Sequence, residues 1–130
     1  MEPGGKKTFR LVLEYDGTGF AGWQVQPGRR TVQGELEKAL HGLAGEAVRV
    51  TAAGRTDAGV HADGQVAHVD LPPEAPRVPV PGLRRGLNTL LPWDVRVLSA
   101  SEATPGWHAR FDALGKRYVY RLRRAEHLPP

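Results

Sequence analysis

Residues 54–62 have the composition of a reactive loop rather than of a core segment. They read Gly-Arg-Thr-Asp-Ala-Gly-Val-His-Ala and follow a strand-like run directly. The two glycines allow tight turns and close approach to a ligand, and local main-chain hydrogen bonds can hold Thr56 and Asp57. A carboxylate at Asp57 suits a nucleophile or a general base, and Arg55 can pair with that carboxylate or with a phosphate. The alternative is an ordinary turn in which Asp57 caps a short helix.

Several imidazole and carboxylate groups near this loop raise the question of a metal site. Asp57, His61, Asp63, His68 and Asp70 carry the oxygen and nitrogen donors that hydrolytic ions use. Their spacing matches no ligand motif, so we expect no metal and expect His68 to be an exposed strand residue. The chain has no cysteine, which excludes thiolate zinc sites and thiolate nucleophiles and fits a reducing compartment.

Residues 17–22 satisfy the glycine pattern of a dinucleotide-binding loop, Gly-x-Gly-x-x-Gly, directly after a strand-like run. That fingerprint needs a helix to begin at the third glycine, so that the helix N-terminus faces a pyrophosphate. Here residues 24–28, Gln-Val-Gln-Pro-Gly, interrupt the chain, and we expect no helix before about Thr31. The sequence therefore predicts no nucleotide cofactor.

The overall composition favours a polyanionic partner. The chain of 130 residues has a net charge of +4 and a pI of about 9.9, and its cations gather at residues 29–30, 84–85 and 110–124. Aromatic residues lie among them, as in proteins that combine phosphate contacts with base stacking; a solvated basic face is the alternative. No apolar run has the length of a membrane span or of a secretory signal, so we expect a soluble, cytoplasmic protein of one domain.

The elements that must position the loop follow from periodicity and caps. Residues 8–15 alternate as a strand. Thr31 can cap a helix that ends at Gly42 and Gly45, and its apolar stripe consists of Val32, Leu36, Ala39, Leu40 and Leu43.

The second half of the chain repeats this alternation of strands and helices. Further strands are predicted at residues 48–52, 65–71, 95–98 and 116–124, with an extended proline-rich connection at 72–81. Leu83, Leu87, Leu90 and Leu91 form a second helical stripe that Pro92 terminates. The order β-α-β-β-α-β with a trailing strand predicts an α+β, ferredoxin-like split βαβ sandwich, in which one antiparallel sheet packs on two helices.

The complete string at residues 54–62 resembles the active-site segment of the tRNA pseudouridine synthase A family, in which the aspartate is essential. Three further stretches resemble the same family in the same order, and the resemblance runs from about Phe9 to Arg124. They are residues 14–17 with 22–24, residues 31–33, and residues 108–111 followed by 116–118.

The resemblance implies a cofactor-free isomerase that converts uridine to pseudouridine in tRNA, at positions 38 to 40 of the anticodon arm. It implies that Asp57 is the catalyst and that Arg55, His108, Arg110 and Tyr118 contact the substrate. Strand alternation leaves a core position open for Tyr118. Addition of the aspartate to C1′ or to the uracil ring, or removal of the C2′ proton, all remain open as mechanisms.

Family members have a second domain and form homodimers, whereas this sequence stops at Pro130. We therefore expect residues 1–130 to be a single N-terminal domain, either a fragment or the product of a truncated gene, and it is open whether this part is active alone or dimerises. Two other functions compete with the isomerase. They are a non-catalytic RNA-binding module with the topology of an RNA-recognition motif, and a metal-dependent hydrolase.

Overall fold

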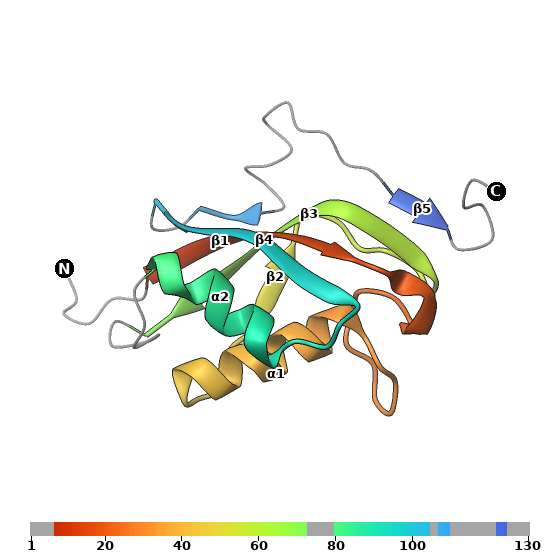
Figure 1. The fold of residues 1–130 in the computed structure, drawn as a ribbon, viewed down its shortest axis with the longest axis horizontal. Helices are drawn as coiled ribbons and strands as arrows, with labels where there is room; N and C mark the ends of the chain where they lie inside the picture. The colour runs from red at the N-terminus through yellow and green to blue at the C-terminus, as the bar shows by residue number, and fades with distance from the viewer. Residues whose placement is uncertain (1–6, 73–79, 105–106, 110–121, 125–130) are drawn as a thin grey trace.

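A computed structural model of the chain describes residues 7–72, 80–104, 107–109 and 122–124 (Figure 1). The element order is strand, short 3-10 turn, helix, two strands, helix, strand and a last short strand. The bounds are β1 (Lys7–Tyr15), η1 (Gly17–Gly19), α1 (Val32–Ala44), β2 (Val50–Ala52), β3 (Val60–Leu71), α2 (Val80–Leu90), β4 (Val95–Ala103) and β5 (Leu122–Arg124).

The strands form an antiparallel sheet in the order β2-β3-β1-β4, and β5 pairs with residues 60–62 of β3. Because β1 and β2 both run antiparallel to β3, they are parallel to each other with β3 between them. The same holds for β3 and β4 on either side of β1. This arrangement is the predicted pair of split βαβ units, and the α+β class is confirmed.

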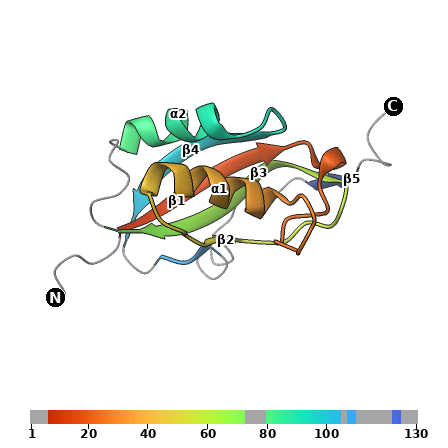
Figure 2. The same ribbon diagram turned by 90° about the horizontal axis from the view of Figure 1, so that it is seen from below.

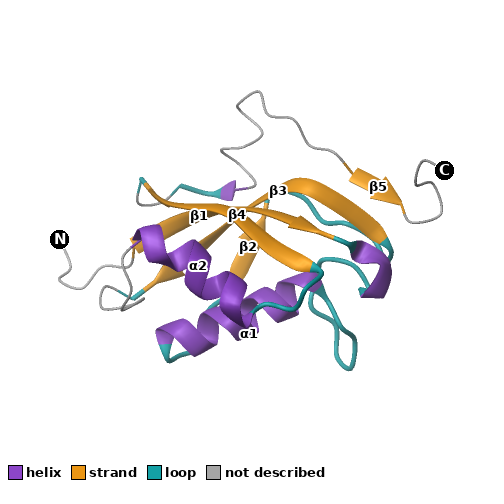
Figure 3. Cartoon of the chain, viewed as in Figure 1, coloured by secondary structure: helices purple, strands orange, loops and turns teal. Residues whose placement is uncertain are grey.

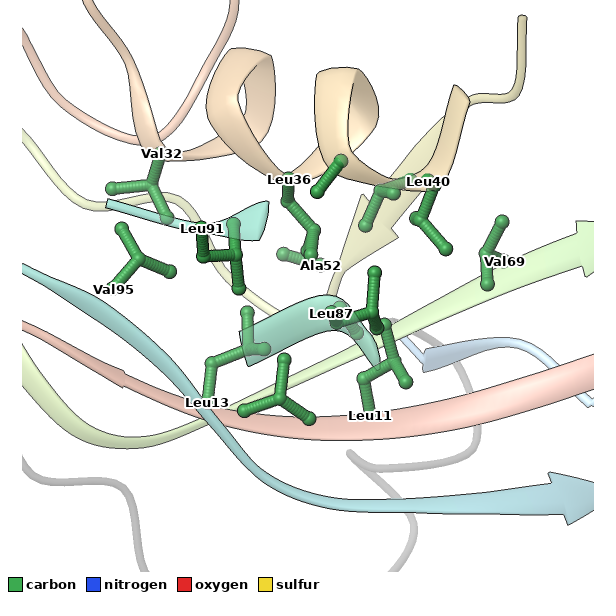
Figure 4. Close-up of a cluster of buried hydrophobic side chains, with 14 of the residues drawn as sticks. Leu11, Leu13, Val32, Leu36, Leu40, Ala52, Val69, Leu87, Leu91 and Val95 are labelled. Carbon is green, nitrogen blue, oxygen red and sulfur yellow. The ribbon is translucent and has the colours of Figure 1, made fainter. Parts of the chain in front are cut away.

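Both helices cover the same face of the sheet (Figures 1 and 2), and the cartoon coloured by secondary structure shows the two layers (Figure 3). The core lies between the layers, where apolar side chains of β1, β3, β4, α1 and α2 meet (Figure 4). Leu11, Leu36 and Leu87 are fully buried there, and burial stabilises the fold by about 2 kcal/mol for each such side chain.

The predicted helix boundaries hold with two corrections. The hydroxyl oxygen of Thr31 accepts from the Gly34 N–H at 3.1 Å, and α1 ends at Gly45 with a φ of 80°. Gly42 lies inside the helix instead of ending it. In α2 the predicted stripe fails at Leu90, which is 50% exposed, although Leu87 and Leu91 are buried. No helix in the described part of the chain is long and apolar enough to cross a bilayer.

Three strands differ in length from their predictions. β3 begins at Val60 instead of residue 65, so His61 and Asp63 lie in a strand and not in a loop. β4 continues to Ala103, and β2 covers only Val50–Ala52. The fifth predicted strand is confirmed at Leu122–Arg124, while residues 116–121 and most of the proline-rich connection lie outside the described residues.

Helix side chains bind the main chain at both outer strands of the sheet. Glu37 accepts from the Val50 N–H at 2.8 Å, and Gln33 donates to the Val50 carbonyl at 2.9 Å. On the opposite side, the Asn88 side chain accepts from the Val97 N–H at 2.8 Å and donates to the Val97 carbonyl at 3.0 Å. These bonds fix α1 against β2 and α2 against β4.

Candidate active site

Asp57 lies in the loop between β2 and β3, and its side chain is exposed. It stands between two residues that line different hollows of the surface. Arg55 lines a groove of about 160 Å³, and Ala58 lines a wider, shallow hollow of about 570 Å³ together with Phe20 and Arg29. A carboxylate at this point is accessible to a nucleotide.

The loop around Asp57 is fixed from below by buried polar side chains. The hydroxyls of Tyr15 and Thr56 are 2.8 Å apart and both residues are buried. Gln65, which is fully buried, donates to the Gly54 carbonyl at 2.7 Å and lies 3.5 Å from the Tyr15 hydroxyl. Burial raises the pKa of the Tyr15 phenol above its ordinary value, so this hydroxyl carries its proton at neutral pH.

The same loop is also fixed from the side by the segment that follows β1. The Trp23 N–H donates to the Thr56 carbonyl at 3.0 Å, and the Gly59 N–H donates to the Phe20 carbonyl at 3.3 Å. Gly22 has a φ of 108°, and a β-carbon there would lie 2.8 Å from the Thr56 carbonyl oxygen. The exposed carboxylate of Asp57 is thus carried by a main chain with several fixed points, which is the condition for preorganised chemistry.

His61 joins the start of β3 to the turn η1. Its Nδ1 accepts from the Gly17 N–H at 3.0 Å and lies 3.1 Å from a carboxylate oxygen of Asp16. Gly17 lies so close to β3 that a β-carbon would stand 1.9 Å from the Val60 carbonyl oxygen. Hydrogen bonds from Thr18 hold the pKa of the Asp16 carboxyl below its ordinary value. These contacts anchor the segment that in turn supports the Asp57 loop.

The predicted basic pair at residues 29–30 divides into two roles. Arg30 makes a two-pronged ion pair with Asp94, with N–O distances of 2.8 and 2.9 Å, and stacks 4.1 Å from the centre of the Phe20 ring. The hydrogen bond to Asp94 raises the pKa of the Arg30 guanidinium. Arg30 is therefore a structural clamp between the loop and Asp94, the residue before β4, whereas Arg29 belongs to no ion pair among the described residues.

His108 lies far from Asp57 in the described part of the chain. Its ring centre is 4.6 Å from that of His68, and the Ala109 N–H donates to His68 Nδ1 at 3.0 Å. His68 is eight residues along β3 from Val60, which corresponds to about 26 Å of strand. The expectation that His68 is exposed is wrong, since it is 7% exposed beneath residues 107–109. Arg110 and Tyr118 lie outside the described residues.

The structure bears on each competing interpretation of the sequence. Residues 17–22 form η1 and a loop, and the next helix begins only at Val32, so the dinucleotide fingerprint lacks its helix. Among the described residues, no three carboxylate or imidazole groups gather as metal ligands. Phe9 and Tyr15 are buried in the core under the helices, so they are not available for base stacking on the open face of the sheet, as an RNA-recognition motif requires.

Sequence reasoning missed the residues that hold the loop, namely Tyr15 and Gln65 as hydrogen-bonding groups. One signal was present. Gln65 shares the parity of Ala67, Val69 and Leu71 and therefore falls on the core face of the strand. An amide at such a position needs buried partners, and the loop preceding β3 is the nearest source of them.

Comparison with known proteins assigns the chain to a family. A sequence model described as tRNA pseudouridine synthase matches residues 11–112. The chain belongs to the tRNA pseudouridine synthase family. The match runs from the middle of β1 past the end of β4 and includes the whole Asp57 loop.

Individual members of the tRNA pseudouridine synthase family are similar over most of this chain. A protein named tRNA pseudouridine synthase A from Frankia casuarinae is 60% identical over 114 residues, which cover 87% of this chain and 40% of that protein. One of the same name from Geobacter sulfurreducens is 49% identical over 124 residues, covering 95% of this chain and 50% of that protein. The chain thus spans about 40 to 50% of the length of these curated relatives.

Proposed function

We propose that the protein isomerises uridine to pseudouridine in tRNA and that Asp57 is its catalytic residue. The observation that carries the proposal is an exposed carboxylate, with neighbours Arg55 and Ala58 that line two hollows, on a loop that buried hydrogen bonds hold in place. Family membership supports the reaction class, and the relatives that share 49 to 60% of their residues with this chain are named for the same activity.

The reaction explains why a carboxylate is needed at this point. Uridine and pseudouridine are isomers, so the bond from C1′ to N1 breaks, the uracil turns, a bond from C1′ to C5 forms, C5 loses its proton, and N1 gains one. No electrons are gained or lost. Asp57 can act by adding to C1′ or to the ring, or by removing the C2′ proton, and in each case it must lie close to a nucleoside that has left the base stack.

The hollow beside Ala58 is the proposed place for that nucleotide. It is bounded by Phe20 and by the exposed Arg29, which offer an apolar surface and a positive charge beside Asp57. Arg55 is proposed to contact the adjoining RNA backbone or to fill the gap that the extruded base leaves. His108, Arg110 and Tyr118 are proposed as further RNA contacts on the strength of the resemblance alone.

The finer features of the function also belong to this proposal. We infer that the target lies at positions 38 to 40 of the anticodon arm, that the enzyme uses no cofactor, and that it acts in the cytoplasm as a homodimer. The family resemblance supports each of these expectations.

Tritium release from tRNA labelled at uridine C5 tests the proposal with the complete gene product. Asp57→Ala and Asp57→Asn should lower the rate by at least about a thousandfold, since the variants lack the reacting group. Their affinity for tRNA should change little, because affinity comes mainly from phosphate contacts. Glu46→Gln is the matched control, since Glu46 is also an exposed carboxylate in a loop, and it should keep full activity. Release that survives in both Asp57 variants would end the proposal.

A further inference from the structure

The groove beside Arg55 runs along the outer edge of β2. Its lining residues come from β2 and its ends, from the loop before α1 and from α1 itself. They are Trp23, Gln24, Gln33, Arg49, Val50, Thr51, Ala52 and Arg55. Arg49 precedes β2 and Arg55 follows it, so one cation lies beyond each end of this short strand.

The charge of this groove differs from that of the hollow between β1, β3 and β4 and resembles that of the hollow beside Ala58, which is lined by Arg29 and Arg30 and by no carboxylate. The groove is lined by two arginines and by no carboxylate. Both arginines are exposed, and neither belongs to an ion pair among the described residues. By contrast, a hollow of about 400 Å³ between β1, β3 and β4 is lined by four carboxylates and a single arginine, Arg96.

The groove also has fixed walls. Gln33 is held at both ends of its amide, because its oxygen accepts from the Val25 N–H at 2.9 Å and its nitrogen donates to the Val50 carbonyl at 2.9 Å. The main-chain groups of alternate residues in a strand point to the same edge. Since the Val50 groups point outward to α1 and the Ala53 N–H bonds inward to Val66 at 2.8 Å, the Ala52 N–H faces the outer edge and adds a neutral donor to the groove.

Two unpaired guanidinium groups, a main-chain donor and the absence of lining carboxylates describe a site for an oxyanion. Arg55 is two residues from Asp57, so an anion bound here lies close to the nucleotide that the carboxylate would attack. We propose that this groove binds a backbone phosphate of the RNA next to the target nucleotide, with Arg49 as the residue that adds specificity for that phosphate. This inference rests on the proposed function and extends it to Arg49, which lies within the matched range but outside the four short stretches quoted for the resemblance.

Binding of tRNA over a range of salt concentrations tests the role of Arg49. Arg49→Gln should weaken binding about three- to tenfold at moderate salt and lower the slope of log K against log salt by about 0.7 to 0.9, the value for one phosphate contact. Arg96→Gln is the matched control, because it removes the same charge from an exposed arginine in the acidic hollow. It should change affinity less than about twofold.

Activity and rescue complete the experiment. Arg49→Gln should raise KM for tRNA while kcat stays within about twofold, since the residue binds ground state and transition state alike. Arg49→Lys keeps the charge and should restore most of the salt slope. Equal effects of Arg49→Gln and Arg96→Gln, or an unchanged slope, would overturn the inference. So would saturable binding of inorganic phosphate that Arg49→Gln abolishes while tRNA binding is unaffected, because the groove would then serve a free anion.

These outcomes are distinguishable from a failure of the proposed function. If the wild-type protein binds tRNA with the expected dependence on Arg49 and yet releases no tritium, the isomerase proposal fails and the phosphate site stands. If the wild type is active and Arg49→Gln behaves like Arg96→Gln, only the phosphate site fails.

Discussion

Removal of the Tyr15 hydroxyl should loosen the Asp57 loop without disturbing the core. Tyr15→Phe keeps the aromatic ring, which packs in the core and lies 6.3 Å from the ring centre of Trp23. It deletes the partner of the Thr56 hydroxyl, 2.8 Å away in a buried position. Gln65 loses its 3.5 Å contact with this hydroxyl but keeps its bond to the Gly54 carbonyl, so the loop retains that support.

The loss of folding stability depends on the buried Thr56 hydroxyl, which Tyr15→Phe leaves without its partner. A buried hydroxyl without a partner destabilises the fold by about 1 to 3 kcal/mol, whereas replacing both partners by apolar groups of similar shape is nearly neutral. Tyr15→Phe and Thr56→Val should therefore each cost about 1.5 kcal/mol, and the double variant should cost clearly less than their sum. With a urea m value of about 1.5 kcal/mol/M, each single substitution lowers the midpoint by about 1 M.

Urea unfolding of the wild type, the two single variants and the double variant measures the interaction energy between the two hydroxyls. Single-turnover tritium release measures the effect of Tyr15→Phe on the rate of the chemical step. Because Thr56 precedes Asp57, we expect kcat of Tyr15→Phe to fall about tenfold while the Kd for tRNA is unchanged. Strictly additive losses of stability in the double variant would show that the two hydroxyls do not interact in solution. A kcat equal to that of the wild type would refute the claim that this bond positions the carboxylate.

Two other perturbations address the segment that supports the loop. Gly17→Ala places a β-carbon 1.9 Å from the Val60 carbonyl oxygen and should cost about 3 kcal/mol in urea unfolding; Gly64→Ala, where no atom lies within 4 Å, should be nearly neutral, and equal costs would contradict the close packing. The pKa of Asp16 lies below its ordinary value of 3.8 in the folded state, so its contribution to stability is present above that value and is lost as the pH falls through the lower, folded pKa. The difference in unfolding free energy between the wild type and Asp16→Asn should therefore shrink with acidification, and a difference independent of pH would refute this account.

The parts of the fold that rest on local patterns were predictable. Alternation identified β1, and a capping hydroxyl at Thr31 with a glycine at position 45 bounded α1. The extensions of β3 and β4 were not predictable, because Gly64 and residues 99–103 carry no strand pattern. These extensions become strand by pairing with β1 and, at residues 60–62, with β5. Contacts with β1, remote in sequence, override the weak local preference there.

In the candidate site, too, features that depend on local sequence were predictable and features that depend on remote contacts were not. The string around Asp57 predicted a site in a loop, and the structure places Asp57 in a loop with its side chain exposed. Its supports were not predictable from local pattern, since Tyr15 and Thr56 are 41 residues apart and Tyr15 and Gln65 are 50 residues apart. The burial of His68 and the pairing of Arg30 with Asp94, 64 residues away, likewise depend on partners that no periodicity reveals.

The side chains that bind Val50 and Val97 bear on how the protein behaves when it is concentrated. A bare outer strand is a template on which a neighbouring molecule can add a strand of its own, and growth from such templates leads to fibrils. Here a strand from a second molecule would first have to displace the side-chain amide and carboxylate groups that already bind the main chain of Val50 and Val97. Gln33, Glu37 and Asn88 thus make strand addition less favourable at one residue of each outer strand, Val50 of β2 and Val97 of β4.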